Sequence, residues 1–142
     1  MKDNVFLDTN ILVYLYSSTE TEKRNISISI LERYRCITSI LALNEFCNVF
    51  IKKYNVPNDK IKDYIANISK SCHIKFINEQ NVYKALEINT RYGYSYYDCL
   101  MLASALESGC GVILTEDMSG GQIIENKLEI VNPFKNQNQG DT

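Results

Sequence analysis

The stretch Asn4-Val5-Phe6-Leu7-Asp8-Thr9-Asn10, close to the start of the chain, decides the fold that we expect. Its apolar residues, Val5 to Leu7, favour a strand buried on both faces, which is typical of a central strand in a parallel sheet. Polar residues that favour turns and helix starts follow at once, beginning with Asp8. Because open α/β sheets bind ligands at the carboxyl ends of their strands, Asp8 is the first candidate site residue.

The rest of the chain alternates helical and strand-like patterns. We predict strands over residues 36–38, 73–77, 111–115 and 128–131, and helices over 20–35, from Ser39 to about 54, from 58 or 59, over 79–91 and over 96–108. Strands separated by helices imply right-handed crossovers and a parallel sheet covered on both faces. The expected fold class is therefore α/β, a three-layer α/β/α sandwich around a parallel sheet of four to five strands.

Length and composition indicate one domain. The chain has 142 residues and a formal net charge of −2, so no global basic field indicates a nucleic-acid partner. We expect residues 1–134 to form the domain and 135–142 to be a polar, disordered tail. No apolar stretch approaches a membrane span and no signal peptide is visible, so we expect a cytoplasmic protein without membrane contact. The five cysteines include no C-x-x-C pair, which disfavours both a disulfide framework and a zinc site.

The acids at predicted strand and helix ends each have a structural alternative. Asp8 could simply cap the helix that follows it. Asp98 shares a helix face with the apolar residues Met101 and Leu102, where an unpaired carboxylate is costly, although Ser95 and Asp98 also fit a capping pattern.

The sequence pattern alone gives weaker support to the remaining acids as site residues. Glu116 and Asp117 follow the second buried strand, where acids also form turns. Glu45 lies opposite the strongest apolar stripe of its helix, so periodicity alone favours a solvent-exposed residue.

Carboxylates that gather at one sheet edge cannot all stay ionised unless a cation joins them. Oxygen-only ligands suit Mg²⁺ or Mn²⁺, which can activate water for attack on a phosphodiester. The single histidine, His73, lies in a predicted strand, so a histidine-dependent triad is disfavoured. Neither a P-loop nor a G-x-G-x-x-G motif occurs, which disfavours an NTPase or a dinucleotide enzyme.

Four segments together resemble a known family. They are Phe6-Leu7-Asp8-Thr9-Asn10-Ile11-Leu12, then Leu43-Asn44-Glu45-Phe46, then the segment from Ser95-Tyr96-Tyr97-Asp98 to Ala105, and Ile113-Leu114-Thr115-Glu116-Asp117. In this order they resemble the PIN domain, and more narrowly the small bacterial VapC-type toxin ribonucleases.

The resemblance implies a Mg²⁺- or Mn²⁺-dependent endoribonuclease whose catalytic, metal-holding acids are Asp8, Glu45, Asp98 and Asp117. It also implies that Thr9, Asn10, Thr115 and Glu116 orient these carboxylates or the water. The pattern departs from many relatives after Thr115, where Met118-Ser119-Gly120-Gly121 replaces a further acid and an aromatic residue. Because Glu116 and Asp117 are adjacent, either could be the fourth acid; the T-x-D spacing favours Asp117.

The implied partners are RNA, a protein antitoxin that covers the site, and a second copy of the chain. Tyr14, Tyr16, Tyr64 and Ile68 could form the dimer face, or could belong to one well-filled core. Lys52, Lys53, Lys84 and Arg91 are candidates to hold the RNA backbone. The alternative function is a catalytically inert PIN-like module that binds RNA or protein. A phosphatase-like hydrolase is disfavoured, because Asn10 stands where a D-x-D motif needs its second acid.

Overall fold

The computed structural model describes residues 2–118 and 120–135. Its strands are β1 (Asn4–Leu7), β2 (Arg35–Ser39), β3 (Cys72–Lys75), β4 (Val112–Leu114), β5 (Ile123–Ile124) and β6 (Leu128–Val131). Its helices are α1 (Thr9–Tyr14), α2 (Thr21–Arg33), α3 (Ile40–Lys52), α4 (Asn58–Ser71), α5 (Glu79–Tyr92) and α6 (Tyr96–Glu107). The predicted tail lies outside the described residues except for Lys135.

The six strands form one sheet in the order β3-β2-β1-β4-β6-β5. The first five strands in this order are parallel, as predicted, and β1 lies between β2 and β4. Only β5 runs antiparallel, against β6. The α/β prediction is confirmed, with a short antiparallel edge strand that the sequence pattern did not indicate.

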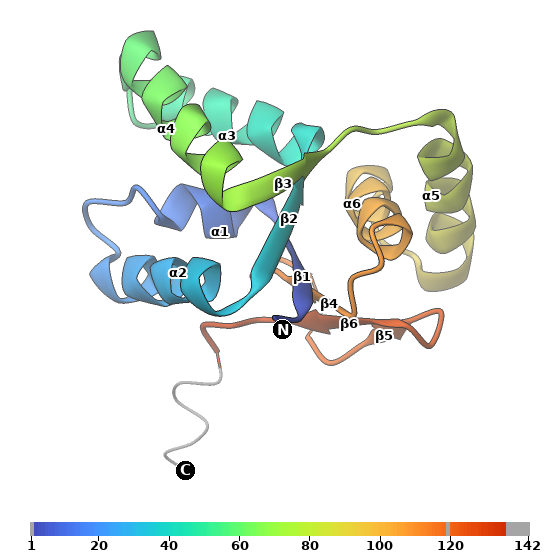
Figure 1. Ribbon diagram of the computed structural model, residues 1–142. Coiled ribbons are helices and arrows are strands. Elements are labelled where there is room, and N and C mark those ends of the chain that lie inside the picture. The colour runs from blue at the N-terminus through green and yellow to red at the C-terminus, as the bar shows by residue number, and fades with distance from the viewer. Residues whose placement is uncertain (1, 119, 136–142) are drawn as a thin grey trace.

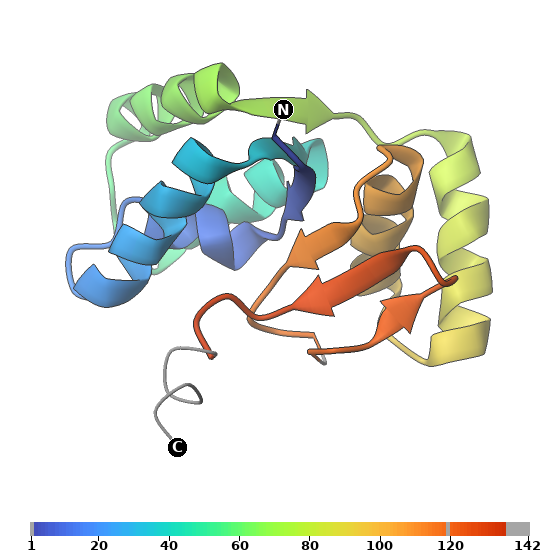
Figure 2. The ribbon, with the colours of Figure 1, turned by 60° about the horizontal axis from the view of Figure 1, so that its bottom comes forward.

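The topology places the helices in two groups. The chain moves from β1 outward to β2 and β3 through α1–α4, and then returns across β1 to β4 through α5 and α6. Because such crossovers are right-handed, the reversal puts the two groups on opposite faces of the sheet. Figure 1 shows α5 and α6 together on the right, separated from α1–α4 by the strands, and Figure 2 shows the same division.

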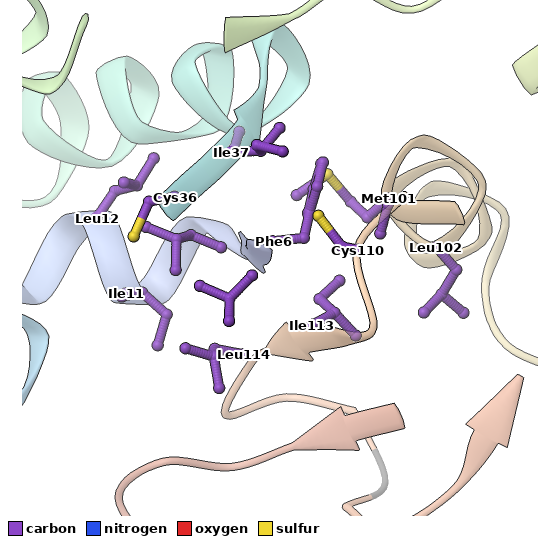
Figure 3. Packing of buried hydrophobic residues seen from close by; sticks show 14 of the residues in the cluster. Phe6, Ile11, Leu12, Cys36, Ile37, Met101, Leu102, Cys110, Ile113 and Leu114 are labelled. Atoms are coloured by element: carbon purple, nitrogen blue, oxygen red, sulfur yellow. The ribbon is translucent and has the colours of Figure 1, made fainter. Parts of the chain in front are cut away.

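The core is continuous across the central strand. Phe6, Leu7, Ile11 and Leu12 are fully buried, which explains the uninterrupted apolar run on both sides of Asp8. Figure 3 shows Phe6 beside Cys110 and near Met101 of α6, while Ile11 and Leu12 lie on the side of α1. Burial on both faces holds β1 in the centre of the sheet. Asp8, the residue after β1, therefore lies at the carboxyl edge of the sheet.

The proposed dimer face belongs instead to this core. Ile68 is only 1% exposed, and the rings of Tyr16 and Tyr64 stack at 4.0 Å within the chain. Tyr14 packs edge-on against Phe134 at 5.2 Å. Of the two alternatives, these contacts favour the single core, because Ile68 is buried in it and Tyr14, Tyr16 and Tyr64 pack partly buried against it.

Several boundaries differ from the prediction by one or two residues. The third strand ends at Lys75 rather than at residue 77, so that Phe76 is 68% exposed. Ser39 and Ser95 do begin helices α3 and α6, each accepting a hydrogen bond from a backbone N–H of the first turn. None of the helices in residues 2–118 and 120–135 has the length and apolar character of a membrane span.

Candidate active site

Asp8 lies at the carboxyl end of the central strand and is the most buried of the candidate acids. Its backbone N–H extends the sheet ladder by donating to the carbonyl of Leu114 at 3.0 Å. One carboxylate oxygen accepts from the backbone N–H of Thr9 at 2.7 Å, and so caps helix α1. The other accepts from the hydroxyl of Thr115 at 2.7 Å. Asp8 therefore does cap helix α1, as the alternative interpretation held, but capping involves only one of its two carboxylate oxygens.

The Asp8 carboxylate is electrostatically disfavoured where it stands. It is only 6% exposed, and this burial is the largest cause that raises its pKa to about 6. The negative charges of Asp117 and Asp98 raise it further, while the bonds from Thr115 and Thr9 act in the opposite direction. Three acids that are distant in the sequence thus share one electrostatic environment at this edge of the sheet.

Asp98 reaches the site from the first turn of α6. It is half-buried on the helix face of Met101 and Leu102, which are both buried, as the periodicity predicted. Ser95 accepts a bond from the backbone N–H of Asp98 at 3.3 Å. Within the described residues the Asp98 carboxylate itself forms neither a hydrogen bond nor an ion pair. Capping therefore accounts for Ser95 but leaves the Asp98 carboxylate available.

Asp117 is tied to the site by two hydrogen bonds. Its carboxylate accepts from the side-chain amide of Asn10 at 2.9 Å, and its backbone N–H donates to the hydroxyl of Thr115 at 3.1 Å. Thr115 is fully buried and bridges Asp8 and the backbone of Asp117. The two strand ends, β1 and β4, are thereby connected through a single hydroxyl group.

The Glu116 side chain is engaged elsewhere. Its carboxylate forms an ion pair with Lys23 at 2.5 Å and accepts a bond from the hydroxyl of Tyr14 at 2.5 Å. Only its backbone N–H contacts the site, donating to the side-chain oxygen of Asn10 at 3.4 Å. This arrangement favours Asp117 over Glu116 as the fourth acid.

Glu45 is exposed, as the helical periodicity indicated, yet it is linked to the site. The hydroxyl of Thr9 donates to the Glu45 carboxylate at 3.0 Å. The two residues that follow Asp8 in the sequence therefore bind two of the other acids: Thr9 binds Glu45, and Asn10 binds Asp117. Helical periodicity cannot predict a contact between side chains of two different helices. Only the family resemblance identified Glu45 as a site residue.

The donor set suits a hard divalent cation, because it consists of carboxylates and hydroxyl groups with an uncompensated buried charge. Within the described residues, however, no three His, Cys, Asp or Glu side chains are close enough to hold one metal ion. Binding by three of these acids would require side-chain rotation. Glu45 and Asp117 are exposed, and Asp98 is half-buried, so rotation of these three does not disturb the core.

Sequence reasoning missed Lys23 and Tyr14. Lys23 lies on α2, 93 residues from its partner Glu116, and its ammonium group also lies over the rings of Tyr14 and Phe134, at 5.0 and 5.6 Å. Hydrogen bonding to Glu116 raises the pKa of Lys23, so this lysine stays charged. The group anchors the loop that carries Asp117, and no local pattern around Lys23 indicates this role.

Comparison with known proteins identifies the family of the chain. The PIN domain family matches residues 5–119. No curated protein sequence gives a significant match.

The solved structures that are similar include a toxin–antitoxin complex from Klebsiella pneumoniae. This complex has 21% identity and a TM-score of 0.70, and covers 92% of this chain and 98% of the other. VapC20 of Mycobacterium tuberculosis, described as a toxin that cleaves the sarcin–ricin loop, has 15% identity and a TM-score of 0.63, with 77% and 86% coverage.

VapBC2 of Rickettsia felis, bound to a DNA fragment from its promoter, has 16% identity and a TM-score of 0.66, with 91% and 99% coverage. Identities this low show a shared fold and leave activity open, whereas the family match spans most of the sequence. The chain belongs to the PIN domain family.

Proposed function

We propose that this PIN domain is a Mg²⁺- or Mn²⁺-dependent endoribonuclease that acts as the toxin of a toxin–antitoxin pair. The observation that carries the proposal is the state of Asp8: a carboxylate that is 6% exposed and feels the charges of Asp98 and Asp117. A protein gains nothing structural from this repulsion, whereas a divalent cation would relieve it.

Asp8, Asp98, Asp117 and Glu45 are the residues proposed to hold the cation. Once bound, the cation would lower the pKa of a water molecule and stabilise the charge that develops on a phosphodiester. Hydrogen bonds from Thr9 and Asn10 keep Glu45 and Asp117 beside the end of β1, and Thr115 fixes the orientation of Asp8.

RNA cleavage by the purified chain tests the catalytic part. We expect cleavage with Mn²⁺ or Mg²⁺, loss of cleavage in EDTA, and a loss of at least about a hundredfold in Asp8→Asn and in Asp98→Asn. Asp63→Asn is the matched control, because Asp63 is an exposed acid on α4 and its substitution removes the same charge. Undiminished cleavage in both site variants would remove the proposal.

The alternative function, an inert PIN-like module, makes a different prediction for metal binding. Calorimetric titration with Mn²⁺ should give a saturable signal for the wild type that is absent in Asp8→Asn. RNA binding without a Mn²⁺ signal would favour the inert module.

The toxin role and its partners need their own test. We propose that expression arrests growth, that Asp98→Asn relieves the arrest, and that a protein antitoxin covers the acids. The natively expressed chain should co-purify with that antitoxin, and its mass should correspond to a homodimer by light scattering. Growth arrest that persists in Asp98→Asn would show that the toxicity does not depend on this acid, and would contradict the proposed toxin role of the site.

A further inference from the structure

A polar cavity lies at the opposite ends of the strands from Asp8. It has a volume of about 650 Å³ and is lined by residues that begin β2 and β3, together with the residues just before them and Lys2. Asp8 follows the last residue of β1, whereas Lys2 precedes the first. Figure 1 marks the N-terminus at the start of β1, away from the end that leads into α1.

Charge in this cavity is of one sign. Lys2, Arg35 and Lys70 supply positive charge, His73 lies beside them in the lining, and no Asp or Glu in the described part of the chain lines the cavity. The whole chain has a net charge of −2, so this concentration of basic groups is a local feature. Neither Arg35 nor Lys70 forms an ion pair with any described residue.

Part of this basic group is held in place. The ammonium of Lys2 donates to the backbone carbonyl of Glu32 at 2.7 Å, which ties the start of the chain to the end of α2. His73 is fixed at the backbone by the parallel pairing of β2 with β3, and Arg35 by the parallel pairing of β1 with β2. Positive charges around a concave surface, with no counter-charge among its lining residues, are the arrangement that recognises phosphate oxygens.

We propose that this cavity binds a phosphorylated small molecule of about nucleotide size. Its volume falls within the range typical of small-molecule sites, roughly 300–1,000 Å³. Leu31 and the ring of Tyr34 also line it and supply an apolar surface for the part of the molecule that carries no phosphate. An extended RNA strand would instead be expected to follow a stripe of basic residues.

Two thiols provide a reporter for occupancy. Cys36 of β2 and Cys72 of β3 are free thiols that lie opposite each other in the register of the two strands. They are 3% and 6% exposed and line the same cavity. The hydrogen bond from Cys72 lowers the pKa of Cys36, and the charge of Lys2 lowers it further. A molecule bound in the cavity should therefore slow alkylation of Cys36, whereas Cys47 on α3 should react at an unchanged rate.

The test uses inorganic pyrophosphate and ADP as probes, titrated calorimetrically into the full chain in EDTA. EDTA prevents any metal–phosphate complex at the acids, so the result is independent of the proposed nuclease activity. We expect saturable binding of both probes and slower alkylation of Cys36 by N-ethylmaleimide, followed by peptide mass spectrometry.

The double variant Arg35→Gln/Lys70→Gln should raise the Kd of both probes about tenfold or more, because two charged hydrogen-bond donors are lost. Lys60→Gln/Lys62→Gln removes the same charge from exposed positions of α4 and should leave the Kd unchanged. The inference is overturned if neither probe binds, if both double variants weaken binding equally, or if only an RNA oligonucleotide binds at Arg35 and Lys70.

Discussion

The hydroxyl of Thr115, at the end of β4, donates a 2.7 Å hydrogen bond to the carboxylate of Asp8, at the end of β1. The same oxygen accepts from the backbone N–H of Asp117 at 3.1 Å. Thr115 is completely buried, so water cannot replace it. One side chain therefore positions two of the proposed metal-holding acids.

Replacing this hydroxyl should weaken both the fold and the site. Thr115→Val keeps the shape but leaves one Asp8 oxygen and the Asp117 N–H without their partner. We expect a loss of about 1–3 kcal/mol in the free energy of unfolding, measured by urea denaturation, and weaker Mn²⁺ binding by calorimetry. Thr115→Ser keeps the donor and should retain most of the Mn²⁺ affinity. Equal loss of affinity in the two variants would contradict this role.

Stability without metal should depend on the ionisation of Asp8. The pKa of Asp8 is raised from its ordinary value of 3.8 to about 6 in the folded chain. Between these two pH values the folded state keeps the proton, whereas the unfolded state releases it. The free energy of unfolding therefore falls as the pH rises from about 4 to 6. The loss is complete about one pH unit above the folded-state pKa, near pH 7, and amounts to about 3 kcal/mol.

Asp8→Asn removes this titration and isolates its contribution. In EDTA, we expect the variant to gain stability relative to the wild type by up to about 3 kcal/mol between pH 4 and pH 7.5. The quantity to compare is the difference in free energy of unfolding between the variant and the wild type, and how this difference changes with pH. Any effect of the amide on the hydrogen bonds that does not depend on pH then cancels. Urea denaturation across this pH range measures it, with Asp63→Asn as the control. A difference that stays constant with pH would show that Asp8 does not titrate as described.

The sequence pattern predicted the central strand well because its burial has no competing interpretation. Val5 to Leu7 form β1, and both strands that end in acids, β1 and β4, lie side by side as expected. The short hairpin of β5 and β6 was not predicted. Its turn places Glu125 and Asn126 at φ of 54° and 59°, a conformation that Asn-Gly pairs usually mark. A glutamate at the first position gives no such signal.

In the site, local reasoning identified the acids but not the contacts that hold them. Asp8 and Asp98 are recognisable because a carboxylate beside apolar residues is unusual. Glu45 is exposed, and its link to Thr9 depends on how α3 packs against α1. Such contacts between elements leave no periodic trace, so the family resemblance was needed to single out Glu45.

The Lys23–Glu116 pair should stabilise the loop that carries Asp117. The two side chains are 32% and 25% exposed, so solvent screens the pair only in part. Lys23→Met should lower the free energy of unfolding by about 1–2 kcal/mol, because among the described residues Glu116 then keeps only the hydroxyl of Tyr14 as a partner of its side chain.

A double-mutant cycle with Glu116→Gln checks this interaction. The double variant should be more stable than the sum of the single losses predicts, since each substitution removes the same contact. Lys62→Met is the control, because its contact with Asp59 is a fully solvated pair at 4.0 Å. Strict additivity of Lys23→Met and Glu116→Gln would show that the pair contributes nothing.

Helix α6 contains a buried hydroxyl that should cost stability. The side-chain oxygen of Ser104 is completely buried and has no hydrogen-bond partner among the described residues. Because an unpaired buried polar group is unfavourable and alanine favours helices, Ser104→Ala should raise the free energy of unfolding by about 1 kcal/mol. Ser108→Ala is the matched control one turn later: its hydroxyl donates to the Ser104 carbonyl at 2.8 Å, so its loss should not stabilise the fold. Urea denaturation of the two variants compares them directly, and a destabilised Ser104→Ala would mean that this hydroxyl is paired in solution.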